Sequence, residues 1–122
     1  MTPAGLQPRA GRVDVALTID LESASVAFAG VTRNIGIGGL FVAAERIGRP
    51  GDELALTFSL PGTPRRLSVK AEVRWIRESF VSEDEEPPGM GLRFLNLSPY
   101  ATVTLVDFLR REEAAQGQAG RS

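Results

Sequence analysis

Apolar and polar residues alternate along several short segments of this 122-residue chain. The longest of these segments runs from Leu67 to Trp75, and others occupy residues 13–21 and 54–60. Successive side chains of a β-strand point to opposite faces of the sheet, so this period indicates strands with one buried and one exposed face. In the segment that ends at Trp75, the alternation places the tryptophan on the buried face.

Three further segments, residues 25–33, 40–43 and 89–95, also have the composition of strands. A proline followed by a glycine marks a turn at 50–51 and another at 61–62. Closing a sheet removes its exposed edges, and strands of this number and length suit such a closed sheet. The sequence therefore predicts an all-β fold, a six-stranded antiparallel β-barrel.

The last apolar segment has a helical period and begins after Ser98, an N-cap residue that is followed by a proline at the first helical position. Its apolar residues form one stripe, composed of Tyr100, Val103, Leu105, Val106, Phe108 and Leu109. We therefore expect one C-terminal α-helix that covers an open end of the barrel. The chain then divides into a flexible N-terminal arm at 1–11, the barrel with its helix at 12–113, and a disordered tail at 114–122.

The composition argues against several classes of function. The chain has no cysteine and no histidine, which removes disulfides, thiolate metal sites and the commonest general base. Carboxylates such as Asp14 and Asp20 are not paired with a base at a recognisable spacing, so we expect neither an enzyme nor a metal site. The net charge of −1 argues against binding DNA or RNA through bulk charge. Without a signal peptide or a long apolar run, we expect a cytoplasmic domain with no membrane insertion.

A glycine-rich stretch from Thr32 to Val42, TRNIGIGGLFV, joins two of the predicted strands. It is not a dinucleotide-binding G-x-G-x-x-G loop, because Phe41 stands at the last glycine position. One interpretation is a tight corner between two strands, which glycine permits. The other is a ligand loop, in which Arg33 presents a planar cation to a phosphate or to a guanine edge.

These segments together resemble a PilZ domain, the bacterial module that binds the second messenger cyclic di-GMP (c-di-GMP). The stretch 32–42 is similar to the family's [D/N]-x-S-x-x-G segment, 73–77 (VRWIR) to its long core strand, and 89–98 (GMGLRFLNLS) to its last strand and helix entry. The resemblance runs from about Arg9 to about Arg111. It implies a ligand that is held between an R-x-x-x-R arm and the [D/N]-x-S-x-x-G segment.

Both ligand motifs of the family are altered in this chain. The arm motif begins at Pro8 instead of an arginine, although Arg9 follows it and Arg12 fits the second position. The other motif has Gly36 instead of its serine. The resemblance implies the following residues as the c-di-GMP site: Arg9, Arg12, Arg33, Asn34, Gly36 and Gly39.

Two functions remain open for such a domain. One is a c-di-GMP receptor, acting in motility or biofilm regulation, whose arm conformation and contacts with an unidentified protein partner change when ligand binds. The other is a PilZ adaptor that does not bind nucleotide and acts through protein contacts, for which Phe80 and Val81 offer apolar surface. A small barrel that binds single-stranded nucleic acid ranks behind both, since the chain is slightly acidic. Either function suits a monomer or a homodimer.

Overall fold

In the computed structural model, the six strands and the helix follow one another in the predicted order. The structure describes residues 12–23, 26–44, 48–63, 65–78 and 87–119. The elements are β1 (Arg12–Glu22), β2 (Ala27–Gly36), β3 (Gly39–Ala43), β4 (Glu53–Ser59), β5 (Arg66–Arg77), β6 (Gly89–Leu95) and α1 (Pro99–Ala119). The predicted arm at 1–11, with Pro8 and Arg9, lies outside the described residues.

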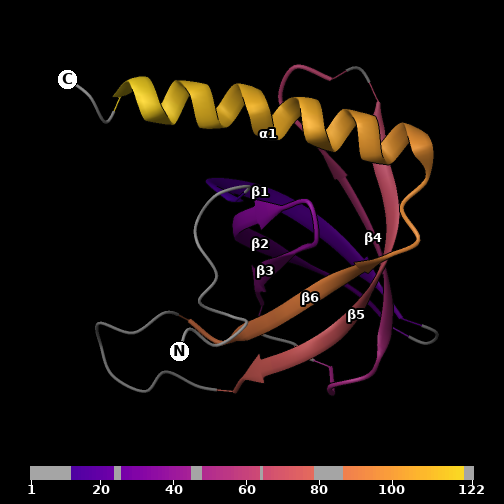
Figure 1. Cartoon of the computed structure of the whole chain (residues 1–122). Helices are drawn as coiled ribbons and strands as arrows, with labels where there is room; N and C mark the ends of the chain where they lie inside the picture. The colour runs from indigo at the N-terminus through magenta and orange to yellow at the C-terminus, as the bar shows by residue number, and fades with distance from the viewer. Residues whose placement is uncertain (1–11, 24–25, 45–47, 64, 79–86, 120–122) are drawn as a thin grey trace, which may run out of the picture.

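The strands form a closed barrel in the order β1-β2-β3-β6-β5-β4, and every neighbouring pair is antiparallel (Figure 1). β1 and β2 pair over nine residues, whereas β1 and β4 close the barrel through three pairs. This architecture confirms the predicted six-stranded antiparallel barrel with one C-terminal helix.

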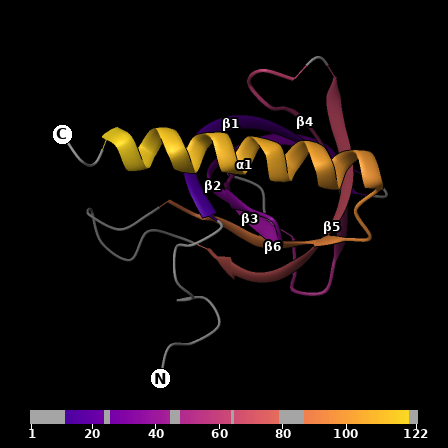
Figure 2. The same ribbon diagram turned by 45° about the horizontal axis from the view of Figure 1, so that its top comes forward.

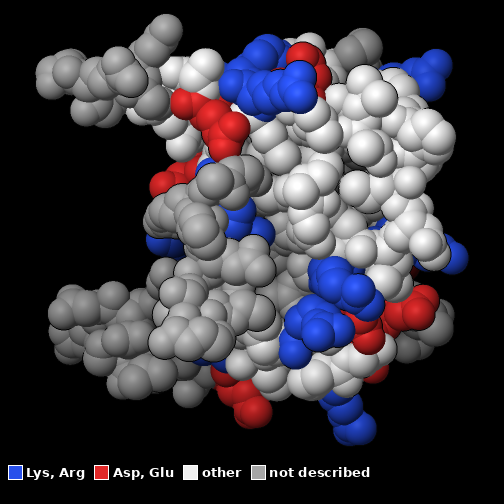
Figure 3. All heavy atoms as spheres, viewed as in Figure 1, with Lys and Arg blue, Asp and Glu red and all other residues white. Residues whose placement is uncertain are grey.

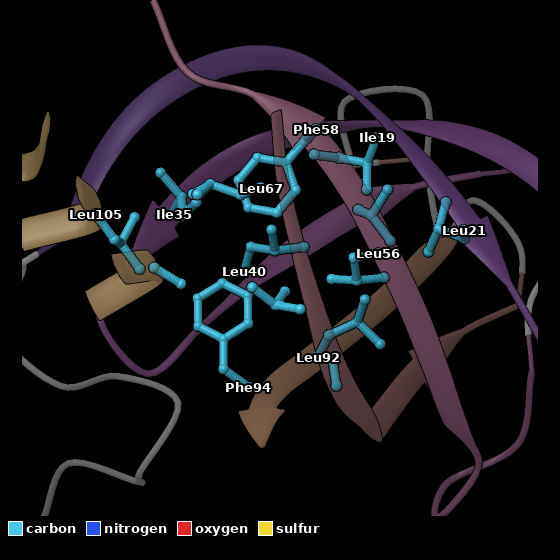
Figure 4. Packing of buried hydrophobic residues seen from close by; sticks show 14 of the residues in the cluster. Ile19, Leu21, Ile35, Leu40, Leu56, Phe58, Leu67, Leu92, Phe94 and Leu105 are labelled. Carbon is cyan, nitrogen blue, oxygen red and sulfur yellow. The ribbon is translucent and has the colours of Figure 1, made fainter. Parts of the chain in front are cut away.

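The inward side chains of all six strands form one hydrophobic core. Figure 4 shows Leu105 of α1 in the same cluster as Ile35 of β2 and Phe94 of β6. Burial of one such side chain contributes about 1.5–3 kcal/mol. The core therefore fixes which face of each strand points outward, and the residues between the core positions form the outer face of the barrel.

α1 crosses one end of the barrel, as Figures 1 and 2 show from two directions. Its start agrees with the prediction, because the hydroxyl oxygen of Ser98 accepts a hydrogen bond from the amide of Ala101 at 3.1 Å. Tyr100 and Val103, which we expected in the buried stripe, are 43% and 68% exposed. Three residues of the predicted stripe, Leu105, Phe108 and Leu109, do face the barrel, and Ala101 joins them there.

The helix is longer than the sequence predicted, since it includes residues 114–119 of the expected disordered tail. Ala114 and Ala115 favour a helix. The side-chain amide of Gln116 also donates a hydrogen bond to the carbonyl oxygen of Asp14 at 3.0 Å, which attaches this end of α1 to β1. Even at 21 residues, α1, the helix of the described part of the chain, is not apolar enough to cross a membrane.

Three strands contain an extra residue, which shifts their pairing and redirects the side chains beside it. These β-bulges lie at 14–17 in β1, 32–34 in β2 and 73–75 in β5. The bulge in β5 interrupts the alternation, so Trp75 is 44% exposed on the outer face. The prediction that Trp75 faces inward is therefore wrong.

Candidate functional site

The glycine-rich stretch is a tight turn between β2 and β3. β2 ends at Gly36, β3 begins at Gly39, and the exposed residues 37–38 connect them. A Cβ atom on Gly39 would lie 2.0 Å from the carbonyl oxygen of Leu92 in β6. Gly39 is therefore required for the close approach of β3 to β6.

Arg12 and Asn34 meet at this turn, which we call the glycine corner (residues 33–39). Arg12 is the first residue of β1 and pairs in register with Gly36, and its guanidinium donates a hydrogen bond to the side-chain oxygen of Asn34. Arg33 is exposed one residue before Asn34. The five predicted site residues that the structure describes thus lie around one corner, whereas Arg9 lies outside the described residues.

The buried hydroxyl of Thr32 stabilises the bulge in β2. Among the described residues Thr32 is the one polar residue that is buried, at 0% exposure. Its hydroxyl donates to the carbonyl oxygen of Phe41 at 2.6 Å and lies 2.9 Å from the carbonyl oxygen of Asn34. Thr32 and Ile35 are both buried although they are three residues apart, which a regular strand does not allow. The bulge therefore keeps Arg33 and Asn34 on the outer side between them.

A row of residues continues from Asn34 across the outer face of the barrel. The register pairs Asn34 of β2 with Phe41 of β3, Phe41 with Gly91 of β6, and Gly91 with Trp75 of β5. The rings of Phe41 and Trp75 are stacked, with centroids 5.4 Å apart and planes at 17°. A Cβ atom on Gly91 would lie 2.1 Å from Nε1 of Trp75. The glycine in β6 thus provides the space in which the indole lies.

Arg77 completes this aromatic cluster of Phe41, Trp75 and Arg77. Its guanidinium carbon lies 5.2 Å from the centroid of Phe41 and 5.5 Å from that of Trp75, within the range of cation–π attraction. The same guanidinium donates a hydrogen bond to the carbonyl oxygen of Pro87 at 3.2 Å. This cluster was not part of the site that the sequence implied. The two glycines of the G-M-G segment in β6 are the signal, because glycine inside a strand often marks a close approach.

Comparison with known proteins identifies the family. A family model described as the PilZ domain matches residues 7–111 of the chain. The chain belongs to the PilZ family. No sequence among curated proteins matches it at a significant level.

Solved PilZ structures have the same fold. The Bacillus subtilis inhibitor of motility, MotI/DgrA, has a TM-score of 0.74 at 23% sequence identity, and the match covers 94% of this chain and 57% of MotI/DgrA. This chain thus spans little more than half of that protein. The PilZ domain of YcgR from Escherichia coli, solved with c-di-GMP, has a TM-score of 0.68 at 17% identity, with 91% and 95% covered. The PilZ domain of CeSA from a cellulose-synthesizing bacterium has a TM-score of 0.54 at 16% identity, with 86% and 97% covered.

In this PilZ domain, charged residues flank the row on β5 and β6. Nη2 of Arg93 lies 3.0 Å from Oε1 of Glu72, and Nη1 of Arg74 lies 3.5 Å from the same oxygen. The hydrogen bond from Arg93 holds the pKa of Glu72 below its ordinary value, and the charges of Arg93 and Arg74 act in the same direction. Figure 3 shows basic side chains over β5 and β6 with acidic neighbours beside them. The outer face thus combines cations, an exposed indole and a glycine corner.

One of the carboxylates that we considered for catalysis, Asp20, lies in an exposed ion pair. Asp20 lies 2.8 Å from Arg66 in an ion pair in which both side chains are exposed. Within the described ranges, no three His, Cys, Asp or Glu residues are grouped so that they could hold a metal ion.

Proposed function

We propose that this PilZ domain is a c-di-GMP receptor that binds its ligand on the outer face, at the glycine corner. The observation that carries this proposal is the hydrogen bond between Arg12 and Asn34, two residues that match the family's separate ligand motifs and that lie 22 positions apart in sequence. The related PilZ domain of YcgR was solved with c-di-GMP, which supports the same ligand class here.

The chemistry of the row suits a cyclic dinucleotide, which presents both phosphates and flat purine bases. A guanidinium such as that of Arg12 or Arg33 can pair with phosphate oxygens or with the O6 and N7 atoms of guanine. The exposed face of Trp75 can stack on a base. Asn34 and Trp75 are separated by three strand spacings, or about 14 Å. The proposed ligand surface therefore extends from the glycine corner to the aromatic cluster.

The two altered positions are expected to weaken the site. Pro8 supplies no guanidinium, and Gly36, which is buried opposite Arg12, supplies no hydroxyl. Each lost hydrogen bond to a charged group costs about 1.5–3 kcal/mol. Because about 1.4 kcal/mol corresponds to a tenfold change in affinity, two such losses can turn a micromolar site into a millimolar one. We propose that Arg9 replaces the contact that Pro8 cannot make.

Calorimetric titration with c-di-GMP tests the receptor. We expect micromolar binding by the unmodified protein, and a loss of at least about tenfold in Arg12→Ala. Arg66→Ala is the matched control, because it removes an exposed arginine from an ion pair with Asp20 and should leave the affinity unchanged. If the folded protein gives no binding heat up to high micromolar ligand, the receptor proposal fails.

The adaptor is the second candidate, and exposed apolar residues on α1 favour it. Tyr100 and Val103 are more exposed than apolar residues of a packed helix face usually are. Phe80 and Val81, which we considered for the same role, lie outside the described residues. The adaptor is supported if the unmodified protein does not bind c-di-GMP and the substitution Val103→Asp nevertheless abolishes its function in the cell.

We further propose that ligand binding orders residues 1–12 against the glycine corner and so changes the contacts of the domain with a protein partner. Hydrogen exchange of residues 1–12 should slow at saturating c-di-GMP, and unchanged exchange would contradict this part of the proposal. MotI/DgrA is named as an inhibitor of motility. On that ground we propose a cytoplasmic role in motility or biofilm regulation.

A further inference from the structure

Arg93 occupies a position beside the glycine corner that the family's ligand motifs do not include. In the register of the barrel it lies between Gly39 of β3 and Glu72 of β5. Its neighbours Leu92 and Phe94 belong to the core, so the side chain of Arg93 projects from the outer face. Gly39 has no side chain that could separate Arg93 from the corner. In addition, the amide of Phe94 donates a hydrogen bond to the carbonyl oxygen of Gly38 at 2.9 Å, which fastens this part of β6 to the corner.

Arg93 shares its acidic partner with a second arginine. Arg93 and Arg74 lie 3.0 and 3.5 Å from the same carboxylate oxygen of Glu72, so one acceptor oxygen serves two guanidinium groups. Glu53 of β4 pairs with Glu72 in register and adds a second carboxylate to this surface. The arginine side chains are 55% and 56% exposed. Ion pairs in such exposed positions are weak, because water and salt screen them. An incoming phosphate can therefore displace Glu72 at little cost.

We propose that Arg93 and Arg74 form an anion subsite that takes a phosphate group of the bound ligand, and that Glu72 occupies this subsite in the empty protein. The inference rests on the proposed function and adds a residue set to it. Phosphate offers several acceptor oxygens to the planar guanidinium of Arg93, whereas Glu72 offers one oxygen to both arginines. The subsite supplies a further cationic contact, besides the one that we assign to Arg9 in place of Pro8.

The test uses Glu72→Gln, which removes the competing negative charge and keeps the size of the side chain. We expect the dissociation constant of c-di-GMP to fall by about threefold, since an exposed ion pair no longer has to be broken. Asp20→Asn is the matched control. It changes the net charge equally and releases Arg66 from an ion pair of 2.8 Å, but Asp20 lies outside the proposed ligand surface. Its dissociation constant should equal that of the unmodified protein.

Arg93→Ala and the double variant Glu72→Gln/Arg93→Ala complete a cycle. Arg93→Ala should weaken binding by about tenfold, and the gain from Glu72→Gln should be lost when Arg93 is absent. If Glu72→Gln and Arg93→Ala both bind like the unmodified protein while Arg12→Ala does not, the subsite is refuted and the receptor stands. If Asp20→Asn tightens binding as much as Glu72→Gln, the effect is one of net charge and the subsite is again refuted. If no protein of the series binds, both proposals fall.

Discussion

The outer face of the barrel has two halves that are built in different ways. On the β2–β3 side, the glycine corner consists of consecutive residues, and Arg12 is added to it by one side-chain hydrogen bond. On the β5–β6 side, the aromatic cluster combines residues that are distant in sequence, with Phe41 on β3 and Trp75 and Arg77 on β5. One half is thus visible in a short sequence motif, and the other exists only once the strands have paired.

Glycine makes both halves possible, for two physical reasons. At Gly39 the neighbour that a Cβ atom would meet is the backbone of Leu92, which cannot move without opening the sheet. At Gly91 the neighbour is the indole of Trp75, which is partly exposed and can move outward. The first glycine is therefore needed for the fold itself, and the second for the position of one side chain.

The largest effect that distinguishes these roles is expected from Gly39→Ala. It should lower the free energy of unfolding by about 3 kcal/mol, because the new methyl group forces β3 and β6 apart. Gly38→Ala is the matched control, since a Cβ atom there meets nothing within 4 Å. It should change stability by less than about 0.5 kcal/mol. Urea unfolding of both variants measures the difference, and equal losses would refute the close-approach role of Gly39.

The sequence predicts the barrel because its signals are local and agree with one another. The alternation of Leu67, Val69, Ala71 and Val73 gives the inward face of β5, and all four residues are buried. The predicted range of the last strand, 89–95, is also that of β6. The resemblance to PilZ domains, which runs from about Arg9 to about Arg111, is confirmed by the family match over residues 7–111.

What the sequence could not predict depends on single residues that interrupt a period. The extra residue in β5 reverses the direction of Trp75, and no local signal in VRWIR distinguishes this strand from a regular one. The end of α1 is attached to β1 by a contact between Gln116 and Asp14, which lie 102 positions apart. In the same way, the ion pairs of Glu72 depend on the register of β5 with β6. Such contacts follow from tertiary pairing and are not encoded in any one segment.

A smaller effect is expected on the β5–β6 side from Gly91→Ala. The added methyl group should push the indole of Trp75 away from the ring of Phe41. Loss of this aromatic contact should lower the free energy of unfolding by about 1.5 kcal/mol. Trp75 is the only tryptophan of the chain, so its fluorescence reports this movement directly. We expect a red shift of the emission in Gly91→Ala. The same spectrum as in the unmodified protein would show that the strand, and not the indole, adapts to the methyl group.

Thr32→Val, one residue before the glycine corner, should lower the free energy of unfolding by about 1 kcal/mol. The substitution keeps the shape of the side chain but removes the hydroxyl that bonds the carbonyl oxygen of Phe41. Thr18→Val provides the control, because Thr18 is exposed on β1 and its change should be close to neutral. Chemical unfolding measures both variants. If Thr32→Val were as stable as the unmodified protein, the β2 bulge would be held by its backbone alone.

The smallest effect concerns the charges of the β5–β6 side and depends on pH. The pKa of Glu72 is lowered in the folded protein, first by the hydrogen bond from Arg93. A lowered pKa means that the ion pairs add stability above the ordinary glutamate value of about 4.5, and that this stability is lost as the pH falls through the lowered value. The difference in Tm between the unmodified protein and Glu72→Gln should therefore be largest near pH 7 and should vanish in acid. A difference that persists in acid would mean that Glu72 acts through packing, and that charge does not hold Arg93 beside the glycine corner.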